Sequence, residues 1–372
     1  MHPHPLPVTV VTSLDPVLRD VATAAVVCDV PGAAVLRYDL GPTAADGLRR
    51  VVSDLSGVVE DVVVPLEHTC LDCAQREDVL PTVSAVAASG RWRSLVLALP
   101  VGAEPTALVQ ALAVGGESAG CVAVRGVVAA VSGASLEDDL LGDALLAERG
   151  LAAGEDDDRA LGEVLAHQLD EADLVLTDTA LAPRAATLLR HLCGPRVPVT
   201  PLGRTDGAAL TRTLRTARGA GPRSDLRAAR RHPVADTAEV WTLELTSPRA
   251  FHPGRLLERV EDLGAGRLRA RGTFWLSTRP STVCAWDGAG GQLSIGDLGT
   301  WGPGERRTHL VVTGTRADDR DRLRRAFTAV LTTEREERER ARSCAPGGGE
   351  DGFEPWLGSR AGHPADPGVV VE

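Results

Sequence analysis

The sequence predicts an α/β fold in which a doubly wound, mostly parallel sheet is followed by a small α+β domain. Short aliphatic runs alternate with helical patterns through the first two hundred residues, which is typical of βαβ units. After Val240 the runs become alternating or aromatic, and only two helical stretches accompany them. At 43% hydrophobic and 24% charged residues, the 372-residue chain can form a sizeable core.

The aliphatic runs of the first half each predict a buried strand, because polar residues, glycine or proline bound them. They are Val8–Val11, Ala33–Tyr38, Val58–Pro65, Leu95–Leu99, Val127–Val131 and Leu174–Leu176. Helical patterns lie between them at Asp15–Ala25, Arg76–Ala88, Pro105–Ala113 and Ala160–Ala172. This order of elements predicts one domain over residues 1–202.

Residues 203–237 change character and predict a solvated linker rich in arginine, glycine and proline. A second domain is predicted over residues 238–343. Its strands lie in "VWTLELTSP", "RGTFWLSTRP", "TVCAWDGAGGQLSIG" and "RTHLVVTG", and its helices at Pro253–Asp262 and Asp318–Ala341. Residues 344–372 predict a mobile tail, with Phe353 and Trp356 as its candidate anchor.

Charge and cysteine usage narrow the class of protein. A formal net charge of −11 argues against a nucleic-acid binder, so no direct DNA binding is expected. Seven scattered cysteines with one close pair are unlike a secreted disulfide framework. With no signal-like N-terminus and no long apolar run, the sequence predicts a cytoplasmic protein without a membrane segment.

The close pair of cysteines lies in "EHTCLDCAQRED", at positions 67–78. Two thiolates three positions apart can converge on one ion, and His68 with Asp72 or Glu67 would complete a tetrahedral zinc site. We therefore predict Cys70, Cys73, His68 and Asp72 as metal ligands, with Glu77 and Asp78 among the acids that offset the charge of the ion. A redox pair and two inert cysteines are the alternatives.

The loop after the first predicted strand, "VVTSLDPVLRD", lacks the features of a phosphate-binding loop. Such a loop needs glycines for its backbone, a lysine for the terminal phosphates and Ser/Thr for magnesium. This loop has no glycine, and the whole chain contains neither lysine nor asparagine. Asp15 would also place a negative charge where phosphates would lie.

Taken in order, these landmarks resemble the CobW family of GTP-binding metallochaperones, which are relatives of the nickel-insertion GTPases. The resemblance covers about Pro7 to Gly358. The family's Cys-x-Cys-Cys motif matches "CLDCAQRED", with Asp72 in the place of the middle cysteine. The CobW C-terminal domain is matched by "FHPGRLLERV", "RARGTFWLSTRP", "AWDGAGGQLSIGDLGTWG" and "RRTHLVVTG", which implies that Trp275, Trp286 and Trp301 are core residues.

Departures from the family pattern concern its nucleotide contacts. Ala98 replaces the family's acidic residue near the magnesium site, and 177–180, "TDTA", replaces the guanine-reading Asn-Lys-x-Asp segment. The resemblance therefore implies a degenerate P-loop domain, a pseudo-GTPase in which bound GTP is not expected. His167 and Gln168, where the family has a helical glutamine, are assigned a structural role.

The resemblance implies zinc binding and metal handling under zinc limitation, through contact with a protein client. A composition rich in Ala, Arg, Gly and Val without lysine suggests a high-GC actinobacterial genome. One alternative is an adaptor that binds a protein partner or the ribosome, as a zinc-responsive recruiter in ribosome hibernation. Another is an active GTPase metallochaperone with an unusual nucleotide pocket.

Overall fold

The computed structural model describes residues 5–41, 46–66, 74–119, 121–208, 224–304, 306–342 and 350–359. The chain divides into two compact units. Unit 1 comprises Met1–Ser224 with His232–Val234, and unit 2 comprises Asp225–Arg231 with Ala235–Glu372. Within the described ranges, no helix combines the length and apolar character that crossing a bilayer requires.

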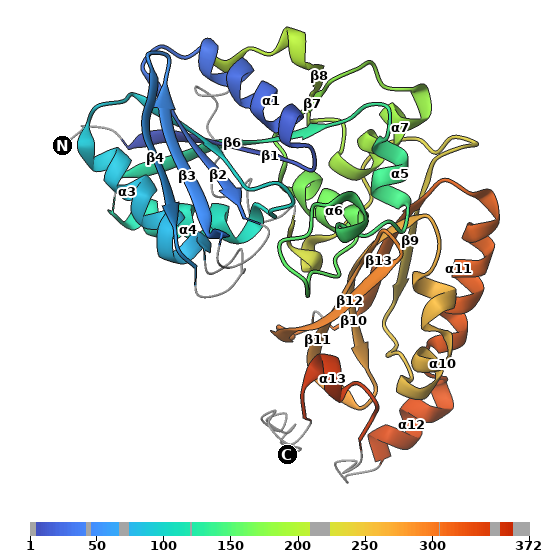
Figure 1. The fold of residues 1–372 in the computed structure, drawn as a ribbon. Helices are drawn as coiled ribbons and strands as arrows, with labels where there is room; N and C mark the ends of the chain where they lie inside the picture. Colours follow the sequence, from blue (N-terminus) through green and yellow to red (C-terminus); the bar gives the residue numbers. More distant parts are fainter. Residues whose placement is uncertain are drawn as a thin grey trace. The chain divides into compact units, whose positions relative to one another are not determined.

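Unit 1 is built on a large sheet (Figure 1). Its strands lie in the order β4-β3-β2-β5-β1-β6-β7-β8. β1 is parallel to both of its neighbours, β5 and β6, whereas β3 and β4 extend the sheet in antiparallel fashion. The predicted doubly wound, mostly parallel sheet is thereby confirmed. The strands are β1 Leu6–Ser13, β2 Ala33–Leu40, β3 Leu48–Asp54, β4 Gly57–Val64, β5 Ser94–Ala98, β6 Val122–Val131, β7 Leu174–Thr177 and β8 Val199–Pro201.

Helices cover both faces of this sheet because strand residues alternate between two cores. On one face, Leu18, Ala22 and Val26 of α1 pack with Val11 of β1. On the other face, residues of α3 and α4 pack with Val10. The helical elements of unit 1 are α1 Pro16–Cys28, η2 Gln75–Val79, α3 Leu80–Ser89, α4 Thr106–Ala119, α5 Leu136–Leu141, η3 Ala147–Arg149, α6 Leu161–Glu171, α7 Pro183–Cys193 and η4 Leu202–Arg204.

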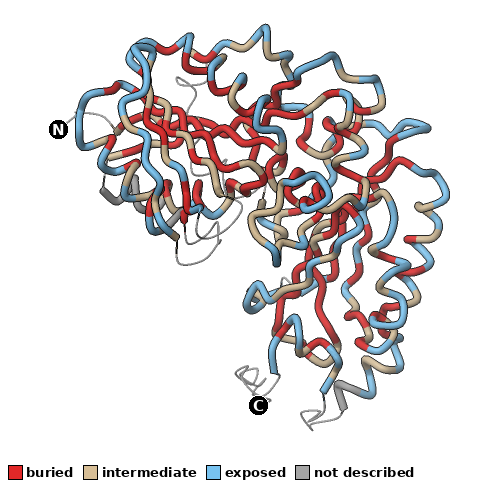
Figure 2. Tube along the Cα trace, viewed as in Figure 1, coloured by how far each residue is buried: buried red, intermediate tan, exposed pale blue. Residues whose placement is uncertain are grey.

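The prediction that Val58–Pro65 forms a buried strand is wrong, because β4 is the exposed edge of the sheet (Figure 2). β3 was not predicted, because its Arg49 and Arg50 interrupt the aliphatic pattern. β3 lies between β2 and β4, so β4 has a neighbour on one side only. Val58 and Val63 are 67% and 60% exposed.

Unit 2 contains an antiparallel sheet in the order β12-β11-β10-β13-β9, as predicted for a small α+β domain. Gly290 and Gly291, both with positive φ, form the tight turn between β11 and β12. The strands are β9 Trp241–Ser247, β10 Leu268–Leu276, β11 Arg279–Ala289, β12 Gln292–Thr300 and β13 Thr308–Gly314. The helical elements are η5 Leu226–Ala228, α10 Pro253–Gly264, α11 Ala317–Val330, α12 Glu334–Arg342 and α13 Glu354–Leu357.

An aromatic cluster forms the core of unit 2. The ring of Phe274 lies 5.3 Å from that of Phe251 and 5.9 Å from that of Trp286, centroid to centroid. Trp275 and Trp286 are buried, as predicted, and Trp301 is half-buried. The single helix predicted over Asp318–Ala341 is wrong, because the chain between α11 and α12 is extended and the Thr332 N–H donates to the carbonyl of Ala250.

Residues 350–359, which we call the C-terminal strap, pack against unit 2. Phe353 is buried in the aromatic core, as its role as an anchor requires, but Trp356 is half exposed. The guanidinium of Arg279 holds the strap by an ion pair of 2.9 Å to Asp351 and by donating to the carbonyls of Leu357 and Gly358. Part of the predicted mobile tail is therefore an ordered element of the unit.

Arg227 and Arg231, in the predicted linker, make specific contacts within unit 2. Arg227 donates to the carbonyls of Leu298 and Thr300, and Arg231 pairs with Asp236. Residues 209–223 of that linker lie outside the described residues. Within the predicted linker, these two solvent-accessible arginines therefore contact unit 2.

Candidate functional site

The connection from β1 to α1 lies where a parallel α/β sheet would hold a phosphate. The hydroxyl of Ser13 donates to the carbonyl of Ala130 at 2.7 Å and accepts the N–H of Asp15 at 3.0 Å. Asp15 is the N-cap of α1, and its carboxylate accepts the N–H of Leu18 at 2.9 Å. This carboxylate places a negative charge at the start of α1 and already accepts a backbone N–H of the first turn of the helix.

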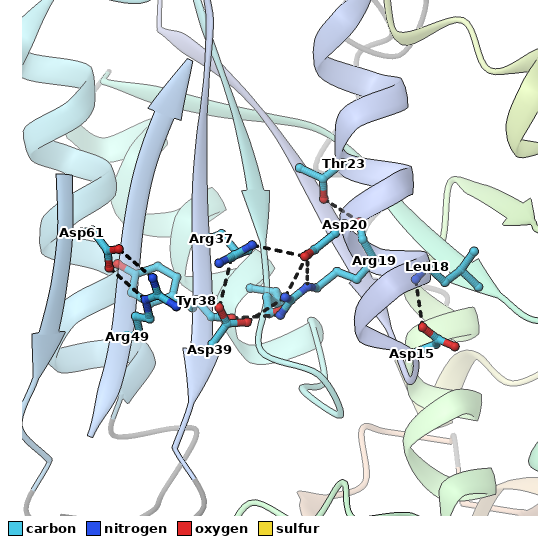
Figure 3. Close-up of polar contacts among 11 residues, drawn as sticks. Asp15, Leu18, Arg19, Asp20, Thr23, Arg37, Tyr38, Asp39, Arg49 and Asp61 are labelled. Atoms are coloured by element: carbon cyan, nitrogen blue, oxygen red, sulfur yellow. Dashed lines mark hydrogen bonds and ion pairs between the residues drawn. The ribbon is translucent and has the colours of Figure 1, made fainter. Parts of the chain in front are cut away.

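After this loop, α1 carries a buried arginine, Arg19, which was not predicted as part of the site (Figure 3). The guanidinium of Arg19 donates to the carbonyls of Tyr38 and Leu99 at 3.1 and 3.2 Å. It also forms ion pairs with Asp20 and Asp39 at 2.9 and 2.7 Å. Arg19 thereby ties α1 to the carboxyl ends of β2 and β5 by charge-assisted hydrogen bonds.

The signal for Arg19 was present in the sequence. Arg19 precedes Asp20 and adjoins the inward stripe formed by Leu18, Ala22 and Val26, so a helical projection places it beside the sheet. What the sequence could not show is that two carbonyls at strand ends would receive its donors. The result is a cation held at the strand ends with its hydrogen bonds directed to the protein itself.

After β5, a second polar cluster surrounds the loop 99–105. The carbonyl of Ala103 accepts from Thr12 at 3.2 Å and from Gln168 at 3.0 Å. Glu104 contacts His167 at 2.7 Å and Arg159 at 3.2 Å. Burial alone would raise the pKa of Glu104, but the hydrogen bond with His167 and the charge of Arg159 outweigh it and lower that pKa. His167 and Gln168 thus make the structural contacts expected of them.

At the end of β7, Asp178 lies within the segment compared above with the guanine-reading sequence. Its carboxylate accepts the N–H of Gly133 at 2.7 Å and the N–H of Thr179 at 2.6 Å. Burial opposes these bonds, but their net effect lowers the pKa of Asp178. The side chain joins the loops after β6 and β7, so its acceptor is used within the fold.

The predicted metal ligands Cys70, Cys73, His68 and Asp72 lie outside the described residues. Elsewhere in the described ranges, no group of three or more His, Cys, Asp or Glu side chains could hold a metal ion. Asp78, which we expected to offset the charge of the ion, is buried and engaged by other groups. It accepts from the hydroxyl of Tyr38 at 2.7 Å and from Arg50 at 2.6 Å.

The other cysteines that fall within the described residues differ in burial. Cys193 and Cys284 are buried as small apolar side chains, and burial raises the pKa of Cys284 to about 12. Cys121 is half-buried, and Cys28 at the end of α1 is exposed. The thiol of Cys284 is therefore neutral at physiological pH.

A groove of about 350 Å³ lies between α1 and the face of β2, β3 and β4. Val27, Val35 and Val51 contribute apolar lining. Charged residues also line it, and they pair with one another: Arg49 with Asp61 at 2.7 Å, and Arg37 with Asp20 at 3.2 Å (Figure 3). The charges of this groove are thus largely neutralised within the fold.

Comparisons with known proteins point to one family. Residues 240–331 match the model of the "Cobalamin synthesis protein cobW C-terminal domain". The zinc chaperone Rv0106 of Mycobacterium tuberculosis is 29% identical over 272 residues, which cover 68% of this chain and 65% of that protein. The zinc-regulated GTPase metalloprotein activator 1 of Dictyostelium discoideum is 23% identical over 266 residues, 65% of this chain and 55% of that one.

The matched region thus spans less than two thirds of either relative. The match with a solved structure of Zn(II)-bound YjiA GTPase from E. coli covers 88% of this chain and 100% of the YjiA chain, at 14% sequence identity. The TM-score of this match is 0.37. The domain match and the curated relatives confirm the resemblance stated from the sequence.

Proposed function

From the premise that this is a CobW-family chain, with the family's C-terminal domain at residues 240–331, we propose that it binds and handles zinc without turning over GTP. Cys70, Cys73 and His68, with Asp72 as the fourth ligand, form the zinc site in this proposal. The observation that carries the zinc part is a Cys-x-x-Cys pair with an adjacent histidine, in a chain similar to a protein named as a zinc chaperone.

The chemistry of these ligands suits zinc better than a hard cation. Thiolate and imidazole are the donors that zinc prefers in tetrahedral sites, whereas magnesium and calcium take oxygen ligands. Thiolates must lose their protons before they bind, and a free cysteine has a pKa of about 8.5. Zinc affinity should therefore fall as the pH is lowered toward 6, where the histidine also becomes charged.

The β1–α1 loop carries the second part of the proposal. Phosphoryl transfer depends on positioned positive charge and backbone donors around the phosphates. In this chain the carboxylate of Asp15 accepts a backbone N–H of the first turn of α1. The sequence also contains no lysine that could supply positive charge to a phosphate. Arg19 directs its guanidinium to two carbonyls and two carboxylates, so it does not supply the missing cation.

Elemental analysis of the purified chain tests the zinc site. We expect one equivalent of zinc in the wild type at neutral pH and none in the Cys70→Ser/Cys73→Ser variant. Cys28→Ser/Cys121→Ser is the matched control, since it removes two thiols outside the cluster, and it should retain the metal. One equivalent of zinc in the Cys70→Ser/Cys73→Ser protein would move the site elsewhere.

A titration with GTP and magnesium tests the nucleotide part separately. We expect neither binding at micromolar concentration nor phosphate release. Magnesium-dependent turnover at micromolar GTP would instead favour the alternative of an active GTPase. The zinc measurement does not depend on this outcome, so each half of the proposal can fail alone.

A second candidate function is an adaptor that binds a protein partner, and the exposed edge strand β4 favours it. The two functions are compatible if the partner is the client that receives or supplies zinc. Capture of the same protein from lysate by wild type and by Cys70→Ser/Cys73→Ser would indicate that partner binding does not need the metal. The ribosome as that partner stays a prediction from the resemblance.

A further inference from the structure

The free edge of β4 is the surface from which we draw a further inference. β4 has eight residues, Gly57–Val64, and pairs only with β3. Four of its valines are at least a third exposed: Val58, Val59, Val62 and Val63. Among the described residues, no hydrogen bond joins the outer side of this strand. Such an edge offers unpaired N–H and C=O groups beside an apolar surface.

The other three sheet edges each carry a feature that blocks pairing. On β12, the guanidinium of Arg227 donates to the carbonyls of Leu298 and Thr300. On β9, the N–H of Thr242 donates to the carboxylate of Asp236 at 3.1 Å. β8 has only three residues, Val199–Pro201, and its last is a proline.

β4 has weaker protection than any of these edges. It contains no proline and no basic residue. A register shift near Val59 bulges its start, but Glu60 to Val64 pair with β3 in regular register. Five consecutive residues of an open, valine-rich strand therefore remain available for pairing with another chain.

Charge on β4 distinguishes the kinds of chain that could pair with it. Glu60 and Asp61 lie in the middle of the strand, and their side chains are 43% and 41% exposed. Arg50 and Arg49 reach them from β3, at 2.9 and 2.7 Å, on the inner side. On the outer side no cation of the described residues faces them, so an incoming strand would gain from a basic residue at this point.

A second copy of this chain does not meet that requirement. A two-fold axis would place β4 against β4, and because the strand has no basic residue, no register puts a cation opposite Glu60 or Asp61. The acids would lie opposite one another, opposite a valine or opposite Gly57, and in the central registers four carboxylates would gather at one seam. Like charges directly opposite each other destabilise a strand pair.

We propose that the outer edge of β4 binds an extended segment of a partner protein, in which aliphatic residues flank a basic centre, by adding it as a further strand to the sheet of unit 1. Main-chain hydrogen bonds to β4 would supply affinity. Valine contacts and the charges of Glu60 and Asp61 would set specificity. The proposal goes beyond zinc handling and does not depend on it.

Three synthetic eight-residue peptides test the proposal by fluorescence anisotropy on the full chain. The first has valine and threonine around two central arginines, the second has glutamates in their place, and the third is the arginine peptide N-methylated at alternate residues. We expect the arginine peptide to bind, the glutamate peptide to bind at least about tenfold more weakly, and the N-methylated peptide not to bind, because it cannot complete the ladder. Equal binding of all three, or of none, would overturn the proposal.

Variants of the edge strands test whether the arginine peptide binds at β4. In Val58→Lys/Val63→Lys both substituted positions are largely exposed, so the variant should fold while it repels the arginine peptide. We expect at least a tenfold loss of affinity, against none for the matched control Leu298→Lys on the edge of β12. A melting curve and a zinc measurement on each variant separate this result from misfolding and from loss of the metal.

Two outcomes of the variant experiment count against the proposal. Unchanged peptide affinity in Val58→Lys/Val63→Lys would place the binding elsewhere. A concentration-dependent dimer of the wild type, seen by sedimentation and abolished in the same variant, would assign the edge to a second copy.

Discussion

Unit 1 and unit 2 each bury an arginine whose surroundings differ in their access to water. Arg279 of unit 2 pairs with Asp351, and the two side chains are 3% and 1% exposed. Arg19 of unit 1 is buried as deeply, but its partners Asp20 and Asp39 are 43% and 34% exposed. One pair is thus sealed from solvent on both sides, and the other is open on the carboxylate side.

This difference in exposure indicates that the pair in unit 2 is a structural clamp, whereas the network in unit 1 forms part of a polar surface. In unit 2 the sealed pair fixes the end of the chain onto a sheet whose two edges are both blocked. In unit 1 the half-open network lies at strand ends, on a sheet whose β4 edge is free. We infer that unit 2 uses its buried arginine to close the fold on itself, whereas unit 1 keeps groups available to other molecules.

Removing Arg279 should have the largest effect. Arg279→Met leaves the Asp351 carboxylate buried without its cation, and breaking such a pair costs about 3 to 5 kcal/mol. Urea denaturation of the full chain should show this loss in the transition of unit 2. Arg306→Met is the matched control, because Arg306 stacks on Trp275 from an exposed position, and it should lose less than about 1 kcal/mol. A loss below that limit in Arg279→Met would mean that the strap is not clamped.

The same clamp predicts a dependence on acid. Burial alone would raise the pKa of Asp351, but hydrogen bonds from Arg279 and Thr278 outweigh it and lower that pKa to about 2. A carboxyl group whose pKa is lowered by folding stabilises the native state above its unfolded pKa of about 3.9. That stability should be lost as the pH falls from about 4 toward 2. In Asp351→Asn, thermal melts over this range should lose part of their acid dependence, whereas an unchanged slope would assign it to other carboxylates.

Removing Arg19 should cost less. In Arg19→Met, water and Arg37 can still reach the exposed carboxylates of Asp20 and Asp39. The carbonyls of Tyr38 and Leu99 lose one donor each, and a typical hydrogen bond contributes about 0.5 to 1.5 kcal/mol net. For two such bonds we expect a loss of about 1 to 3 kcal/mol in unit 1. A loss as large as that of Arg279→Met would remove the distinction drawn between the two networks.

The sequence predicted the class of both units because hydrophobic periodicity depends on local residues. The strands around β1 are continuous valine and leucine runs, and buried parallel strands require such runs. β3 was missed since its pattern, "LRRVVSD", contains two arginines whose partners, Asp61, Glu60 and Asp78, lie on other elements. Because β3 was not predicted, the segment that forms β4 was wrongly expected to be a buried strand.

Long-range polar contacts could not be predicted from the sequence for the same reason. Nothing local indicates that Arg279 meets Asp351, which lies 72 residues further along the chain. The capping role of Asp15, by contrast, was accessible, because an aspartate followed by proline at the start of a helical pattern is an N-cap signal. Sequence reasoning took its charge as a bar to phosphate, and the structure adds that it caps the helix.

The last and smallest effect concerns the open edge of β4. Val63→Lys replaces an exposed side chain, so the free energy of unfolding should change by no more than about 0.5 kcal/mol. Its effect should appear instead in binding of the arginine peptide, because a lysine on an edge strand opposes pairing with a further strand. Fluorescence anisotropy should show a weaker affinity for that peptide than in the wild type. Leu298→Lys should not change that affinity, since Arg227 already occupies the carbonyls of the β12 edge. If both variants weaken peptide binding equally, general charge rather than an open strand is responsible, and the two units would not differ in the way their sheets end.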